Sequence, residues 1–108
     1  MAINKLTDEN FESEVLKSDK PYVAIFSATS WCKPCQMLHS SLPEFEKKIG
    51  DDVKIGEMDI ESSPNTPTQY SCRSVPSIFL FKAGEAVAST TGAQTPEDLK
   101  NWVKSNLG

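Results

Sequence analysis

The sequence between Pro21 and Ile60 has the pattern of a strand, a helix and a second strand. Pro21–Phe26 is a short apolar run, which is typical of a strand buried on both faces. The next apolar residues recur every three or four positions and predict one face of an amphipathic helix; they are Leu38, Leu42, Phe45 and Ile49. Gly50 suits the end of that helix, and Val53–Ile60 has the composition of the next strand. This unit predicts an α/β protein.

The segments around this unit complete the expected fold. Four elements are predicted there: a helix that starts at Thr7, a short helical turn from Ser63 to Tyr70, a hairpin of Ser77–Phe81 and Ala86–Thr90, and a last helix that starts at Thr95. Gly84 can adopt the left-handed backbone of the hairpin turn, and Pro96 suits the first position of the last helix. Leu99, Trp102 and Val103 form the predicted buried face of that helix. A strand–helix–strand unit followed by a hairpin gives a mixed sheet with helices on both faces, and we expect one domain over residues 1–108.

The composition is that of an ordinary globular protein. Hydrophobic residues make up 38% of the chain, charged residues 24%, and the net charge is -4. This acidic balance, with a single arginine at Arg73, argues against nucleic-acid binding, which needs a basic surface. The segment Met1–Lys5 becomes polar at once, and no apolar run approaches the ~20 residues of a membrane span. We therefore expect a cytoplasmic protein that binds neither nucleic acid nor membranes.

Two cysteines, Cys32 and Cys35, lie where the first strand gives way to the amphipathic helix. The carboxyl end of a strand is where open α/β sheets place their functional sites. The amino terminus of a helix stabilises an anion through its free amides and its dipole, so a cysteine there is a better thiolate. Pro34 has no amide hydrogen and fits the first turn, and Lys33 adds a cation beside the sulfurs. In the cytosol such a pair is more often catalytic or metal-binding than a permanent bridge.

The spacing predicts different roles for the two thiols. Cys32, at the helix cap and next to Trp31, is expected to be the exposed attacking thiolate. Cys35, one turn further in, is expected to be the resolving thiol that breaks a mixed disulfide. Two other interpretations stay open: plain packing residues, or a zinc site that His39 and Cys72 would complete. Structural zinc usually uses two close-spaced pairs of ligands and Cys72 stands alone, so we favour a redox pair and expect no metal.

Several segments together resemble the thioredoxin family. They are Phe26–Thr29, the motif Trp31–Cys35, Val75–Pro76, Phe81–Glu85 and Gly92, and the resemblance extends from about residue 5 to residue 107. It implies a thioredoxin fold, in which a mixed sheet of four to five strands is flanked by four helices. It also implies a protein-disulfide reductase whose Cys32 and Cys35 cycle between a dithiol and a disulfide, with no cofactor of its own.

The same resemblance implies partners and a surface around the site. Protein disulfides would be the substrates, thioredoxin reductase or an equivalent electron donor would recharge the pair, and we expect a monomer. The residues that would shape the site are Trp31, Lys33, Pro34, Val75, Pro76 and Gly92. Pro76 suits the first residue of a strand, because proline cannot donate to the ladder. The resemblance implies that the Val75–Pro76 bond is cis and faces the cysteines.

Three departures from the family pattern concern the motif and the helix after it. Lys33 replaces the usual glycine of the motif, an extra residue precedes Trp31, and Pro43 stands three residues after the usual helix proline. Cys72 occupies a position that is usually aliphatic, so we expect a small buried hydrophobe there, with a regulatory thiol as the alternative.

The fourth departure removes the family's buried aspartate. Ile25 or Phe26 stands in its place, and Glu57 replaces the lysine usually found beside it. By alternation along its strand, Glu57 shares a face with Val53, Ile55 and Asp59 and is expected to point toward the same interior. It is therefore a candidate acceptor of the Cys35 proton; the alternative is a solvated Glu57 and transfer to water. These changes keep two further functions open: the same fold tuned toward disulfide oxidation or isomerisation, or a non-enzymatic metal-binding or docking module.

Overall fold

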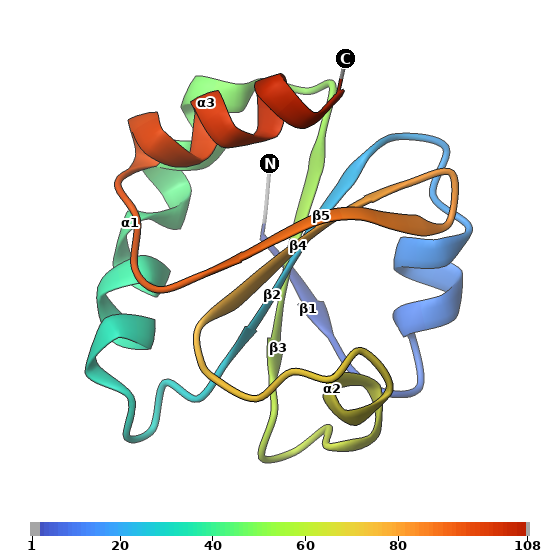
Figure 1. Ribbon diagram of the computed structural model, residues 1–108, viewed down its shortest axis with the longest axis vertical. Coiled ribbons are helices and arrows are strands. Elements are labelled where there is room, and N and C mark those ends of the chain that lie inside the picture. Colours follow the sequence, from blue (N-terminus) through green and yellow to red (C-terminus); the bar gives the residue numbers. More distant parts are fainter. Residues whose placement is uncertain (1–2, 108) are drawn as a thin grey trace.

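Five strands form the sheet at the centre of the computed structural model, which describes residues 3–107 (Figure 1). The elements in chain order are β1 (Asn4–Leu6), the π-helical turn η1 (Glu12–Leu16), β2 (Tyr22–Ser27), α1 (Lys33–Ile49), β3 (Lys54–Asp59), α2 (Asn65–Gln69), β4 (Ser77–Lys82), β5 (Glu85–Thr91) and α3 (Pro96–Leu107). No helix within residues 3–107 is long and apolar enough to cross a membrane.

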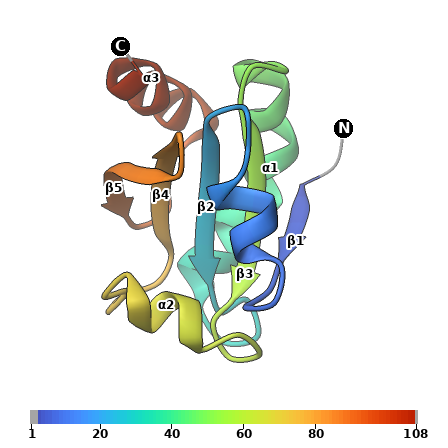
Figure 2. The same cartoon turned by 90° about the vertical axis from the view of Figure 1, so that its right-hand side faces the viewer.

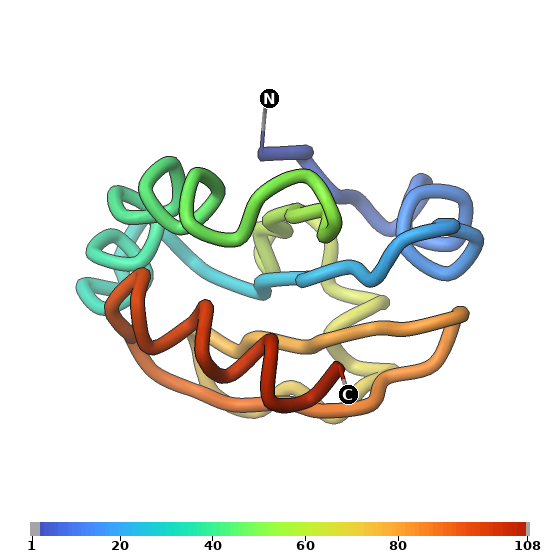
Figure 3. Tube along the Cα trace, turned by 90° about the horizontal axis from the view of Figure 1, so that it is seen from above, coloured from blue at the N-terminus to red at the C-terminus, as the bar shows by residue number. Residues whose placement is uncertain are grey.

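The strand order is β1-β3-β2-β4-β5, and the sheet is mixed. β1, β3 and β2 run parallel, whereas β4 is antiparallel to β2 and β5 is antiparallel to β4. Helices α1 and α3 cover one face of the sheet, while η1 and α2 cover the other (Figure 2). Seen from above, α3 packs beside α1 (Figure 3). The predicted α/β class and thioredoxin fold are confirmed, with η1 counted among the four helices.

The central strand β2 divides the core in two. All six of its residues are buried, and their side chains alternate between the faces. Val23 and Ile25 pack with the apolar residues of α1 and α3, whereas Tyr22, Ala24 and Phe26 pack with η1 and the end of α2. This is the outcome expected of a short apolar run at the middle of a sheet.

The amino-terminal segment differs from the sequence prediction. β1 was not expected, because only Leu6 of its three residues is buried and the strand depends on pairing with β3. Thr7 does cap the turn that follows: its Oγ1 accepts from the Asn10 amide at 3.2 Å, and its own amide donates to Asn10 Oδ1 at 2.8 Å. The helical residues after this cap are the π-helical turn Glu12–Leu16 instead of a longer α-helix.

Two glycines hold positions that a larger residue would strain. Gly84 has φ +82° and follows Ala83 at φ +54°, so the two form the left-handed turn of the β4–β5 hairpin. Gly56 lies in β3, where an added Cβ would come 2.7 Å from the Tyr22 hydroxyl and 2.8 Å from Leu6 Cγ. The close packing of β1 against β3 therefore requires glycine at position 56.

The ends of α1 and α3 follow the predicted signals. Gly50 ends α1 with φ +82°, and the helix continues through Pro43. Thr95 Oγ1 accepts from the Asp98 amide at 3.0 Å, which caps α3. Of the buried face predicted for α3, Trp102 is only partly buried.

Candidate active site at the β2–α1 junction

Cys32 is the residue that caps the amino terminus of α1. Its Sγ accepts a hydrogen bond from the backbone amide of Cys35 at 3.2 Å. This amide has no partner within the helix, so the sulfur fills the place usually taken by a serine or threonine oxygen. The Cys35 amide and the dipole of the 17-residue helix together favour negative charge on this sulfur. Pro34 lies in the first turn, where no amide hydrogen is needed.

Cys35 lies one turn deeper. It is fully buried, whereas Cys32 keeps 5% of its surface exposed, so the prediction of an exposed Cys32 is correct only in relative terms. The amide of Ala28 donates to Cys35 Sγ at 3.4 Å. Burial raises the pKa of the Cys35 thiol to about 11, and the hydrogen bond with Cys32 and the charges of Cys32 and Glu57 act in the same direction. Cys35 is therefore a protonated thiol at neutral pH.

The loop before α1 is held by an acidic residue that the sequence did not single out. Glu61 accepts from Trp31 Nε1 at 2.9 Å and from Ser30 Oγ at 2.6 Å. Trp31 remains 61% exposed, so its ring presents an apolar surface beside the cysteines.

A second segment faces the cysteines across the site. The thiol of Cys32 donates to the Val75 carbonyl at 3.7 Å, and the Val75–Pro76 bond is cis, as the resemblance implied. The amide of Gly92, which has φ +91°, donates to the Pro76 carbonyl at 2.9 Å. The structure thus brings Val75, Pro76 and Gly92 to the cysteine pair, while Lys33 lies exposed at the start of α1.

The residues proposed for a zinc site do not gather. His39 Nδ1 lies 2.7 Å from Glu57 Oε1, and the partly buried Cys72 donates its thiol to the Ser74 carbonyl at 3.4 Å. Within residues 3–107, no group of three or more histidine, cysteine, aspartate or glutamate side chains could hold a metal ion. Cys32, Cys35 and Cys72 are all free thiols.

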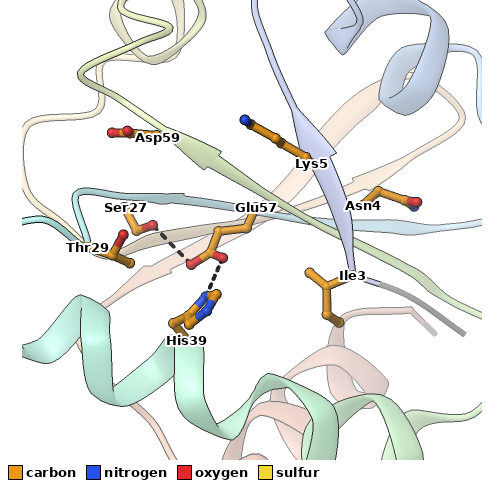
Figure 4. Close-up of a pocket in the computed structure, with 8 residues that line it drawn as sticks. All are labelled: Ile3, Asn4, Lys5, Ser27, Thr29, His39, Glu57 and Asp59. Atoms are coloured by element: carbon orange, nitrogen blue, oxygen red, sulfur yellow. Dashed lines mark hydrogen bonds and ion pairs between the residues drawn. The ribbon is translucent and has the colours of Figure 1, made fainter.

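Glu57 points toward α1, as the alternation along its strand predicted. Its side chain is 15% exposed and lines a cavity of about 290 Å³, together with residues of β1, β2 and α1 (Figure 4). Ser27 Oγ donates to Glu57 Oε2 at 3.1 Å, and His39 contacts the other oxygen. Glu57 is paired in register with Ile25, which lies on the same face, whereas Phe26 lies in the opposite core. Ile25, and not Phe26, is therefore the residue of β2 that lies beside Glu57 on the α1 face.

No local pattern in the sequence indicated the contact between His39 and Glu57. The two residues are 18 positions apart and lie on α1 and β3, so their contact depends on how the helix crosses the sheet. The spacing of four between Cys35 and His39 placed the histidine near the site but suggested a metal ligand. The hydrogen bonds from Ser30 and Trp31 to Glu61 could not be predicted from the sequence for the same reason, because the partners are about 30 positions apart.

A capped thiol beside a buried, protonated one, at the junction of a strand and a helix, is the arrangement of a thiol–disulfide oxidoreductase. The thioredoxin family model matches residues 2–105. Curated proteins named thioredoxin from Rickettsia typhi and Rickettsia bellii are each 40% identical, over 97% and 99% of this chain and 99% and 100% of their own lengths. A thioredoxin from Acidithiobacillus ferridurans is 39% identical over 98% of this chain and 97% of its own. The chain belongs to the thioredoxin family and is a protein-disulfide reductase that carries electrons by dithiol–disulfide exchange.

Proposed function

We propose that Cys32 is the nucleophile and Cys35 the resolving thiol of this reductase. The observation that carries the assignment is the hydrogen bond from the Cys35 amide to Cys32 Sγ, which favours negative charge on Cys32, while burial keeps Cys35 protonated. The two thiols are held one helical turn apart and differ in access to solvent.

The reaction then runs in two exchange steps. The Cys32 thiolate attacks one sulfur of a protein disulfide, so the substrate S–S bond breaks, one substrate thiolate leaves and a mixed disulfide forms. Cys35 loses its proton and attacks the Cys32 sulfur, which forms the Cys32–Cys35 disulfide and releases the second substrate thiolate. Two electrons pass from the pair to the substrate, and the released thiolates take up protons.

The proton of Cys35 needs an acceptor, and Glu57 is the candidate among the described residues. Its charge contributes to the raised pKa of Cys35, which means that the two groups interact. Its carboxylate reaches Ser27, the residue before the Ala28 amide that contacts Cys35. A base is effective when it reaches the proton directly or through one water. Transfer straight to water is the competing route.

We further propose the surroundings in which this cycle works. The exposed ring of Trp31 and the segment of Val75, Pro76 and Gly92 would receive an extended substrate chain. Thioredoxin reductase or an equivalent donor would return the disulfide to the dithiol, and the chain would act as a monomeric single domain. A cytoplasmic location fits this cycle, because thiols are kept reduced there.

Substitution of each cysteine tests the assignment. In a dithiothreitol-coupled insulin reduction assay, Cys32→Ser and Cys35→Ser should both lose turnover. Incubated with a disulfide-bonded protein, Cys35→Ser should accumulate a covalent mixed disulfide, whereas Cys32→Ser should not. Accumulation by Cys32→Ser alone would reverse the roles.

A further inference from the structure

We propose that His39 is a positioning residue that acts through Glu57: it holds the carboxylate in place and releases a proton to solvent when Glu57 accepts the proton of Cys35. The inference rests on the proposed role of Glu57 and extends it to a second side chain. In this proposal, Glu57 and His39 together do the work of the family's buried aspartate and connect the interior of the protein to its surface.

The contacts of Glu57 form a line from the buried end of β2 to the exposed side of α1. On one side, the hydroxyl of the buried Ser27 donates to Oε2 at 3.1 Å. On the other side, His39 Nδ1 lies 2.7 Å from Oε1, a length typical of a charge-assisted hydrogen bond. Both carboxylate oxygens are thus engaged, and Figure 4 shows the carboxylate directed at the imidazole ring. Few orientations remain open to a side chain held from both sides.

The two side chains differ in how far they are exposed to solvent. Glu57 is 15% exposed, whereas His39 is 60% exposed. His39 lies one turn after Cys35 on α1, so the same helix carries the buried thiol and the ring that lines the cavity. The imidazole nitrogen that does not face Glu57 is therefore free to exchange a proton with water.

Other charged groups around the pair come from three elements. Lys5 of β1 and Asp59 of β3 line the same cavity, and Cys35 lies on α1. Figure 4 places Lys5 and Asp59 on the opposite side of Glu57 from His39. In the described part of the chain, His39 is the one basic side chain within 4.0 Å of the Glu57 carboxylate. A change in the charge of His39 therefore acts on the Glu57 carboxylate from a shorter distance than the charge of any other described basic side chain.

The transfer is balanced in protons and moves no electrons. The S–H bond of Cys35 breaks as the proton reaches Glu57, directly or through one water. His39 donates its Nδ1–H to Oε1 as an imidazolium, and once Glu57 has taken up the Cys35 proton the imidazolium has lost its ion partner. The N–H bond at its other nitrogen then breaks as that proton passes to water, which leaves both Glu57 and His39 neutral. Imidazole is suited to this step because its ordinary titration range spans neutral pH. The net result is one proton moved from the buried thiol to solvent.

In a Cys72→Ala background, which removes the third free thiol and serves as wild type here, a chromogenic disulfide, 5,5′-dithiobis(2-nitrobenzoate), separates Cys32 and Cys35 in one stopped-flow trace. Attack by Cys32 releases the first thionitrobenzoate, and attack by Cys35 on the mixed disulfide releases the second. The variants His39→Gln, His39→Ala and Glu57→Gln should keep the first phase and slow the second several-fold near neutral pH. The wild-type profile of the second phase against pH should contain a group that both His39 variants lose.

Imidazole added to the buffer distinguishes a role of His39 in proton transfer from a purely structural role, because free imidazole can replace only the former. It should restore the second phase of His39→Ala in proportion to its concentration and leave Glu57→Gln slow. Ser40→Ala, an exposed neighbour on α1, serves as the matched control and should behave as wild type. A second phase equal to wild type at every pH in both His39 variants would overturn the inference and leave the reductase intact. A wild-type protein that releases no second thionitrobenzoate would refute the proposed cysteine roles themselves.

Discussion

The backbone amide of Cys35 donates a hydrogen bond to the sulfur of Cys32 over 3.2 Å. In the roles proposed above, Cys35 thus supplies both the amide that stabilises the Cys32 thiolate and the thiol that later attacks the Cys32 sulfur and releases the substrate. The proposed order of the two steps agrees with this contact, because the amide favours negative charge on Cys32, whereas burial raises the pKa of Cys35.

The two cysteines should differ in alkylation. Iodoacetamide at pH 7 should modify Cys32 of the reduced protein well before Cys35, because alkylation needs the thiolate and burial raises the pKa of Cys35 to about 11. Labelling of Cys35 should increase only as the pH rises toward that value. Fragment-ion mass spectrometry of the labelled protein locates the modification, and equal labelling at pH 7 would contradict the burial argument.

Lys33 should raise the reduction potential of the pair slightly. A cation next to Cys32 favours the thiolate and so the reduced form, but Lys33 is exposed and screened. Lys33→Gly should lower the potential by about 5–20 mV, measured by equilibration with glutathione buffers. Lys33→Arg keeps the charge and should match wild type. An unchanged or higher potential in the glycine variant would reject this electrostatic effect.

Cys72 should react slowly in the folded, oxidised protein. It is partly buried against the aromatic cluster on the η1 face, rather than fully buried as expected, and its thiol donates to the Ser74 carbonyl. Labelling with a maleimide under native conditions should therefore be slower than in the unfolded protein. Labelling at the unfolded rate would indicate a thiol that is open to regulation by oxidation.

Gly56→Ala should destabilise the fold by about 1–3 kcal/mol, the usual cost of overpacking. The added Cβ would lie 2.7 Å from the Tyr22 hydroxyl and 2.8 Å from Leu6 Cγ. Guanidinium unfolding measures the change in the free energy of unfolding. In a Tyr22→Phe background the cost should be smaller, because one of the two contacts is removed. Equal stability of Gly56→Ala and wild type would mean that β1 moves away freely.

Asp8 should stabilise the protein in a pH-dependent way. Its carboxylate accepts from the Asn65 amide at 3.1 Å and from the Thr66 amide and hydroxyl, both at 2.8 Å. Burial raises the pKa of Asp8, but the hydrogen bonds from Thr66 and Asn65 outweigh burial and leave the pKa below its usual 3.8. A lowered pKa gives stability that is present above the unfolded value and lost as the pH falls through the folded one.

Asp8→Asn should therefore unfold at a lower urea concentration than wild type at pH 7. As the pH falls below the ordinary value of 3.8 and then through the lower pKa of folded Asp8, the two proteins should converge. Thr68→Ala, at an exposed position in the same short helix, controls for general effects on α2. A constant difference between Asp8→Asn and wild type at every pH would exclude the carboxylate charge as the cause.

The parts of the fold that the sequence predicted are those with local signals. The apolar run of β2 and the four-residue spacing in α1 each need no distant partner to be recognised. β1 has no such signal, because it is a strand only through its pairing with Gly56–Met58 of β3. In the same way, the cap position and depth of the cysteines followed from spacing along one helix.

The contacts that the sequence could not predict join separate elements. Alternation along β3 placed Glu57 on the correct face, but its bonds to Ser27 and His39 depend on the position of α1 over the sheet. The choice between Ile25 and Phe26 as the replacement for the family's aspartate also needed the register, which pairs Ile25 with Glu57. Side-chain direction was thus predictable, and side-chain partners were not.

The three-residue strand β1 also decides how this sheet meets other protein chains. Asn4–Leu6 pairs with Gly56–Met58, and β3 is therefore an inner strand instead of a border of the sheet. Without this cover, the free amides and carbonyls of β3, next to the buried side chains of Ile55 and Met58, would form a template onto which a foreign strand could add. Because β1 is so short, the border that it presents instead offers little length for such pairing. Resistance to aggregation through this edge thus depends on a segment that contributes only one buried side chain to the core.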